Sequence, residues 1–140
     1  MSKKVETEMK TEKIAEAEYG ETIKNLQNLI KNLSLNSDMK KRLYWDVKQY
    51  LESAESAAYF AGLEDGRQHP EVSSPILISE TYFFDITTND LDSVLNYFLI
   101  PQDEYEVLVQ KVEICRLQAE KVAYHQGFLD WRKYRNINNV

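Results

Sequence analysis

The chain contains few of the residues that cross-link or interrupt a fold: one cysteine, four glycines and three prolines among 140 residues. The single cysteine, Cys115, excludes a disulfide within the chain. No apolar run approaches the roughly 20 residues that a membrane-spanning helix needs, and the first residues lack the apolar core of a signal peptide. We therefore expect a protein of the reducing cytoplasm that does not enter a membrane.

The signatures of common catalytic sites are also missing. The two histidines, His69 and His125, have no histidine, cysteine or carboxylate at the spacing of a known metal motif. The sequence has neither a glycine-rich phosphate loop nor a Gly-x-Ser-x-Gly elbow. We therefore expect no catalytic residue, no metal and no cofactor, and the sequence does not predict an enzyme.

What the chain does contain is an internal repeat. Residues 54–67 recur as residues 119–132 at a constant offset of 65, and seven of the 14 positions are identical. The identical pairs are Ala54/Ala119, Glu55/Glu120, Ala58/Ala123, Tyr59/Tyr124, Gly62/Gly127, Asp65/Asp130 and Arg67/Arg132. Glu55 and Glu120 could supply two inward carboxylates, but a di-metal site in a helical bundle also needs Glu-x-x-His elements, which are absent from the sequence.

Small residues recur at every fourth position within each copy, so a helix would place them in one narrow stripe. Glycine costs about 1 kcal/mol relative to alanine inside a helix, so the matched Gly62 and Gly127 indicate a close approach of two helices or a helix end. We expect the two copies to cross near these glycines. The predicted contact residues are Ala58, Tyr59, Gly62, Ala123, Tyr124 and Gly127.

A crossing with pseudo-twofold symmetry would let Asp65 reach Arg132 while Asp130 reaches Arg67, because an aspartate and an arginine two positions apart on one helix do not face each other. We expect these reciprocal ion pairs. A second interpretation of the repeat is a functional site, lined by Tyr59, Tyr124, Asp65 and Asp130.

Apolar spacing predicts helices over most of the chain. The pattern is clear from about Thr22 and frayed before Gly20, which divides the chain into a flexible or frayed N-terminal helix at 1–20 and a single helical domain at 21–140. A second helix should follow an N-cap at Asn36 or Ser37 and end near Gly66.

Beyond the second helix, residues 76–86 have the character of extended chain, with a minor β element as one outcome. A cap within 87–89 should begin a short helix, and Pro101 suits the first turn of a long final helix that ends near Arg135. The apolar residues of the short helix are Leu91, Val94, Leu95, Phe98 and Leu99. The prediction is an all-α bundle of about four helices with two related helix-ending repeats.

Negative charge is concentrated in the middle of the sequence. Residues 51–110 carry twelve acidic side chains and one basic side chain, while the whole chain has a formal net charge of -6. Such a surface attracts a basic partner, and carboxylates can occupy the lysines and arginines with which a nucleic-acid-binding protein meets phosphates. The alternative is a solvated face that contributes only solubility. The acids expected to bind a partner are Glu64, Asp65, Asp85, Asp90, Asp92, Asp103, Glu104 and Glu106.

Two clusters, 40–45 and 132–135, mix cations with aromatic rings as single-strand binders do. Each holds only three cations and the net charge opposes a polyanion, so we expect no direct nucleic-acid contact. Patches of both signs could instead drive self-association. An apolar seam is either the contact of a homodimer or buried within the bundle; its residues are Ile23, Leu26, Ile30 and Leu33.

Segments 57–66 and 123–128 resemble the Tyr-x-x-Gly-Phe ends of helices in small proteins of Firmicutes and their phages. An acidic, cofactor-free helical protein is also similar in kind to phage inhibitors of host defence, including anti-CRISPR proteins, several of which present acids to a nuclease's nucleic-acid channel. This resemblance implies a non-enzymatic inhibitor in the host cytoplasm whose acidic region blocks a basic partner such as a CRISPR or other defence nuclease. The alternative is a structural homo-oligomeric or adaptor bundle.

Overall fold

The structure is a computed structural model that describes the backbone of residues 3–70 and 88–138 and the side chains of 16–70 and 91–135. Its described helices are α1 (Lys3–Lys31), α2 (Ser37–Gln68), α4 (Thr88–Leu95) and α5 (Gln102–Asn138). The prediction of an all-α helical bundle is confirmed. The expected extended segment at 76–86 lies outside the described residues, and the division at residue 20 stays a prediction.

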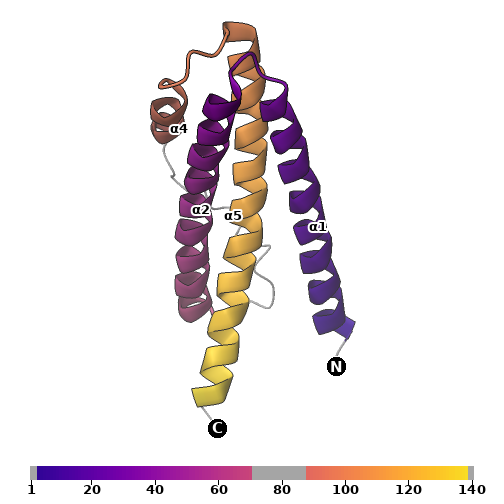
Figure 1. The fold of residues 1–140 in the computed structure, drawn as a ribbon. Coiled ribbons are helices and arrows are strands. Elements are labelled where there is room, and N and C mark those ends of the chain that lie inside the picture. The colour runs from indigo at the N-terminus through magenta and orange to yellow at the C-terminus, as the bar shows by residue number, and fades with distance from the viewer. Residues whose placement is uncertain (1–2, 71–87, 139–140) are drawn as a thin grey trace.

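The long helices α2 and α5 run in the same direction, and α1 runs against both (Figure 1). The most extensive packing in the described part of the chain joins α2 to α5, and α1 packs mainly on α5. The short helix α4 lies against the beginning of α2. Because the two copies of the repeat lie on α2 and α5, the parallel arrangement brings equivalent residues of the copies side by side.

The N-terminal end of α2 has the cap expected from the sequence, and its C-terminal end differs from the expected position. The side chain of Asn36 accepts a hydrogen bond from the backbone N–H of Met39 at 2.8 Å, so Asn36 is the N-cap. At the other end, the N–H of His69 bonds the carbonyl oxygen of Asp65 at 2.9 Å, and Pro70 lacks the N–H to continue the helix. The helix therefore ends two residues beyond the predicted Gly66.

The final helix begins one residue after Pro101, whose carbonyl oxygen accepts the N–H of Tyr105 at 2.8 Å. Asp103 and Glu104 occupy the first turn, where negative charge is favoured by the helix dipole. The predicted short helix ends earlier than expected, at Leu95. No helix among the described residues is long and apolar enough to cross a membrane.

The hydrophobic core lies between the first half of α5, the C-terminal half of α1 and the N-terminal half of α2, with α4 closing one side. The apolar seam of α1 faces this core: Leu26, Ile30 and Leu33 are buried and Ile23 is partly buried. Packing within the bundle therefore accounts for the seam. The core also contains the fully buried Leu43, Val47, Leu91, Leu95, Leu108, Val112 and Cys115.

In the second half of α2 and α5, the two backbones touch. A Cβ atom built on Gly62 would collide with the carbonyl oxygen of Tyr124 and lie 3.0 Å from the amide nitrogen of Phe128. A Cβ atom on Gly127 would collide with the carbonyl oxygen of Tyr59 and lie 3.0 Å from the amide nitrogen of Leu63. The hydrogen in place of each Cβ points at a carbonyl oxygen, the arrangement of a weak Cα–H···O contact.

These contacts follow the offset of the repeat. Each glycine meets the tyrosine of the other copy, so the two helices are related by a pseudo-twofold axis. Ala54, Ala58 and Ala119 continue the close approach and are buried. The copies differ at Gly66, because its counterpart Trp131 packs its side chain 3.2 Å from the place that a Cβ on Gly66 would occupy. The larger residue of one copy thus fills the space left by the glycine of the other.

Gly62→Ala and Gly127→Ala should each lower the free energy of unfolding by about 1–3 kcal/mol, since the added methyl forces the helices apart. This loss opposes the roughly 1 kcal/mol by which alanine favours a helix. Gly20→Ala is the matched control, because nothing lies within 4 Å of its Cβ position, and it should raise stability. Urea unfolding measures all three variants. Equal stabilisation of all three would contradict a backbone contact.

Candidate functional site

The crossing of α2 and α5 is fastened by two reciprocal tyrosine–aspartate hydrogen bonds. The hydroxyl of Tyr124 donates to Oδ2 of Asp65 at 2.6 Å, and the hydroxyl of Tyr59 donates to Oδ2 of Asp130 at 2.6 Å. The four residues are two pairs of repeat equivalents, so each bond is the pseudo-symmetric copy of the other. They hold the helices together along the same stretch in which the glycines bring the backbones into contact.

The expected ion pairs between Asp65 and Arg132 and between Asp130 and Arg67 were wrong, because the structure gives both aspartates tyrosine partners instead. Arg67 turns to Glu64 on its own helix, with Nε 3.1 Å from Oε2. The guanidinium of Arg132 lies over the ring of Phe128, 4.5 Å from its centroid. A buried guanidinium is costly, whereas a neutral hydroxyl satisfies an aspartate inside the crossing at lower cost.

The two symmetric bonds differ in their surroundings. Tyr124 is 0% exposed and Asp65 is 4% exposed. Asp130 is partly exposed and also accepts a hydrogen bond from the side chain of Gln126 at 2.7 Å. Because Asp65 and Tyr124 are buried, a partner cannot reach this half of the crossing, and it serves the packing of the helices. Two of the four residues of the expected functional site are therefore inaccessible.

Tyr124→Phe should therefore destabilise the protein more than Tyr59→Phe. Loss of the Tyr124 hydroxyl leaves a buried carboxylate without that donor, at a cost of about 1.5–3 kcal/mol. Asp130 keeps Gln126 and access to water, so the matched Tyr59→Phe variant should lose less. The two variants remove the same atom from the same kind of pair, and urea unfolding compares them directly. Equal losses would show that the two halves of the crossing are energetically equivalent.

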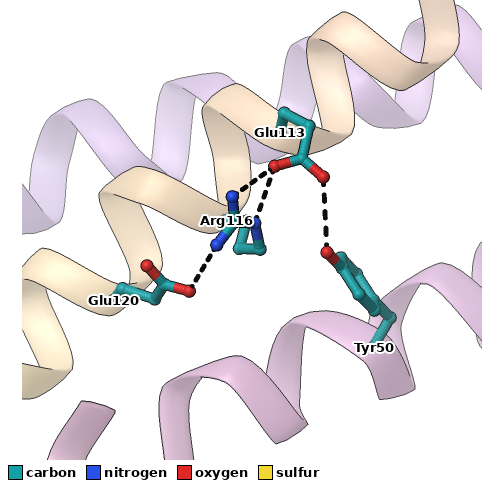
Figure 2. Close-up of polar contacts among 4 residues, drawn as sticks. All are labelled: Tyr50, Glu113, Arg116 and Glu120. Atoms are coloured by element: carbon teal, nitrogen blue, oxygen red, sulfur yellow. Dashed lines mark hydrogen bonds and ion pairs between the residues drawn. The ribbon is translucent and has the colours of Figure 1, made fainter. Parts of the chain in front are cut away.

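Next to the crossing, α5 carries a polar layer that faces α2 (Figure 2). Arg116 donates from Nε to Glu113 at 2.7 Å and from Nη1 to Glu120 at 2.8 Å. Glu113 also accepts a hydrogen bond from the hydroxyl of Tyr50 on α2 at 3.3 Å. Burial, followed by the charge of Glu113, raises the pKa of Tyr50 to about 12. Burial also raises the pKa of Glu120, although Arg116 acts against it.

The repeat equivalents Glu55 and Glu120 take different partners. Oε1 of Glu55 accepts the hydroxyl of Tyr19 on α1 at 2.7 Å, whereas Glu120 is paired with Arg116. Burial, and then the hydrogen bond to Glu55, raises the pKa of Tyr19. The structure brings no group of three or more His, Cys, Asp or Glu residues together as a metal site within its described part. Glu55 thus links α2 to α1, whereas Glu120 is paired within α5.

Arg116→Met should lower the free energy of unfolding by about 3 kcal/mol at neutral pH, because it leaves two largely buried carboxylates without their cation. With Arg116 gone, only the causes that raise the pKa of Glu120 remain. A carboxyl group whose pKa is raised on folding binds its proton more tightly in the folded state, so stability falls as pH rises through that pKa. The loss should therefore be smaller at about pH 5 than at neutral pH.

Arg42→Met is the control for this pH dependence. Its guanidinium lies 3.6 Å from Asp46 and its side chain is 63% exposed, so removal of the pair should change stability by less than about 1 kcal/mol at either pH. Urea unfolding of both variants and the parent at the two pH values makes the comparison. A loss in Arg116→Met that is the same at both pH values would contradict the assignment of Glu120 as the titrating group.

The acids predicted to bind a partner do not form one surface. Asp85 and the side chain of Asp90 lie outside the described residues. Asp65 is buried in the crossing. Glu64 is exposed near the C-terminal end of α2 and forms a salt bridge with Arg67. Of the remaining acids, Asp92 lies on α4 and Asp103, Glu104 and Glu106 lie on the first turns of α5, two elements that the hydrogen bond between Asp92 and Tyr105 links.

We call this place the acidic corner and define it by Asp92, Asp103, Glu104 and Glu106 with the apolar residues Tyr97, Leu99 and Val107. Oδ1 of Asp92 accepts the hydroxyl of Tyr105 at 2.9 Å, which ties α4 to α5. Oε1 of Glu104 accepts the backbone N–H of Ser34 at 2.8 Å. Asp103 and Glu106 are exposed, and Glu106 accepts a hydrogen bond from Gln102.

Large apolar side chains of the acidic corner are exposed to solvent. Leu99 is 91% exposed and Tyr97 is 65% exposed. Neither residue was identified from the sequence as exposed. Leu99 was also assigned to the apolar face of a helix, which was wrong because α4 ends at Leu95. The signal was available in the run Tyr97-Phe98-Leu99-Ile100, since four consecutive apolar residues cannot all face one core. Phe98 alone among them is fully buried.

The basic residues at the start of α2, Lys40, Lys41 and Arg42, lie at the same end of the bundle as the acidic corner. Lys40 donates to the backbone carbonyl of Lys31, and the guanidinium of Arg42 stands 5.8 Å from the ring centroid of Tyr97. Trp45 follows one turn later and is 58% exposed. One end of the molecule thus carries both signs of charge together with exposed aromatic rings.

Comparison of the chain with models of protein families, with curated proteins and with solved structures gave no match.

Proposed function

We propose that the protein is a non-enzymatic inhibitor that binds a basic partner through the acidic corner. The partner is a nucleic-acid-binding protein, a CRISPR or other defence nuclease among the candidates, and the corner occupies the surface that otherwise meets phosphates. The observation that carries the proposal is the 91% exposure of Leu99 in the connection between α4, which carries Asp92, and the first turns of α5, which carry Asp103, Glu104 and Glu106. A monomeric helical protein gains nothing for its own stability from a leucine in that position.

The composition of the acidic corner supports this proposal. Protein interfaces combine a few large apolar or aromatic anchors with a polar rim, and Tyr97 and Leu99 have the exposure of such anchors. Among the rim acids, Asp103 and Glu106 are the most available to a partner. Asp92 and Glu104 already accept hydrogen bonds that connect parts of the fold. Carboxylates in this setting can pair with arginine in the way that phosphate does.

The alternative function is a homodimer or an adaptor bundle. The basic residues of α2 at the same end of the molecule favour it, since the acidic corner of one copy could meet Lys41 and Arg42 of another across a twofold axis. The two functions differ in their concentration dependence: a homodimer changes mass with its own concentration, whereas an inhibitor of a foreign protein does not need to. Sedimentation at low and high salt separates them.

Charge reversal by Asp103→Lys with Glu106→Lys should abolish capture of the basic partner. Both side chains are exposed and neither closes a contact between helices, so the fold should persist. The measurement is a pull-down from a lysate of cells that carry the gene, at low and at high salt, with mass spectrometry of the bound proteins. Recovery of the partner should fall at least about tenfold in the variant and in high salt.

The matched control is Glu18→Lys with Glu21→Lys, which changes the net charge by the same amount on the exposed face of α1. It should capture the partner as the parent does. A captured nucleic-acid-binding protein should also lose its bound DNA or RNA when the purified parent is added. Equal capture by the corner variant, or a captured protein that keeps its nucleic acid, would remove the basis for electrostatic mimicry.

A further inference from the structure

A groove of about 440 Å³ lies between α1, α2 and α5, alongside the half of the bundle in which α2 and α5 cross. Two features leave this space open. Helix α1 diverges from α5 toward its N-terminus (Figure 1), and α5 presents the small residues Ala119 and Ala123 to the groove. A smaller hollow of about 210 Å³ adjoins Tyr19 and Glu55 on the side of the core.

The walls of the groove combine carboxylates with aromatic rings. Glu16 and Glu55 line it, and none of the described residues that line it is basic. The rings come from Tyr19, Tyr59 and Phe60. The faces of such rings carry partial negative charge and attract cations, most strongly where water is partly excluded.

Hydrogen bonds hold the groove in shape before any ligand arrives. The hydroxyl of Tyr19 donates to Oε1 of Glu55 at 2.7 Å and links α1 to α2, while the hydroxyl of Tyr59 is held by Asp130 on α5 at 2.6 Å. Tyr59 and Phe60 meet edge to face with ring centroids 5.9 Å apart. Because both tyrosines already donate their hydrogens to carboxylates, their rings rather than their hydroxyl protons remain for a ligand. Glu55 still has lone pairs to accept a further donor.

We propose that this groove binds a free alkylammonium ion, with the ammonium group at Glu16 and Glu55 and the alkyl chain along Ala119, Val122 and Ala123. Two carboxylates with no cation among the described lining residues repel anions, and an uncharged apolar ligand would leave both charges without a counterion. The described part of the chain offers no group of three metal-ligating side chains, so an organic cation fits the wall better than a metal ion. The proposal does not depend on the acidic corner, which lies at the other end of the bundle.

The test is a titration of the whole protein with hexylammonium, followed by calorimetry and by the methyl signals of Ala119 and Ala123 in NMR spectra. Hexan-1-ol and hexanoate are the ligand controls, because they share the chain and lack the positive charge. Hexylammonium should bind saturably and at least tenfold more tightly than either control, and it should shift both methyl signals. Binding no tighter than that of hexan-1-ol, or methyl signals that do not move, would overturn the proposal.

Two variants test whether the charges of the groove carboxylates contribute to binding while the fold is kept. Glu55→Gln removes the charge and keeps an oxygen that can accept the Tyr19 hydroxyl. Glu16→Gln changes only an exposed side chain, so it should not affect folding. Each should weaken hexylammonium binding at least threefold, whereas Glu21→Gln, which does not line the groove, should leave it unchanged. An unaltered affinity in both groove variants sinks the proposal. Tighter binding of Nα-acetyl-lysine amide than of hexylammonium would indicate the lysine side chain of a peptide as the ligand and would contradict a free alkylammonium ion.

Discussion

The backbone contact between α2 and α5 is the constraint on which the rest of the molecule depends. At Gly62 and Gly127 no side chain separates the helices, and each glycine faces a carbonyl oxygen of the other helix. Contact this close fixes both the distance and the register of the pair, because interiors are close-packed and a single methyl group cannot be accommodated. The two helices run parallel (Figure 1), so equivalent residues of the repeat lie side by side along the crossing.

The remaining contacts are arranged around this pair. Tyrosine–aspartate bonds secure the crossing itself, and the layer of Glu113, Arg116 and Glu120 marks the change from small residues to the larger apolar core. Helix α1 completes the core through its seam and then leaves α5, so the groove opens on one side of the crossing. The surface features that could serve a partner, Tyr97 and Leu99 with their acids, lie at the opposite end, where little internal packing depends on them.

Much of this fold was predictable from local rules, because capping and periodicity depend on near neighbours. The Asn36 cap and the all-α class are examples. Side-chain partners across a crossing were not predictable, since they depend on its geometry: Asp65 looked like a surface acid and is buried beneath Tyr124. The polar layer had a readable signal in the spacing of Glu113, Arg116 and Glu120, which places all three beside the buried face of α5. The groove had none, because it arises from the divergence of two helices.

The central claim is that α2 and α5 touch backbone to backbone at symmetric positions. The most direct measurement is a pair of nuclear Overhauser effects in the NMR spectrum of the labelled protein, between the α-hydrogens of Gly62 and the amide hydrogen of Phe128, and between those of Gly127 and the amide hydrogen of Leu63. The structure places the Cβ positions of both glycines 3.0 Å from these amide nitrogens, so both cross-peaks should be present with similar intensity. Absence of both, in a spectrum in which the four residues are assigned and helical, would contradict the account.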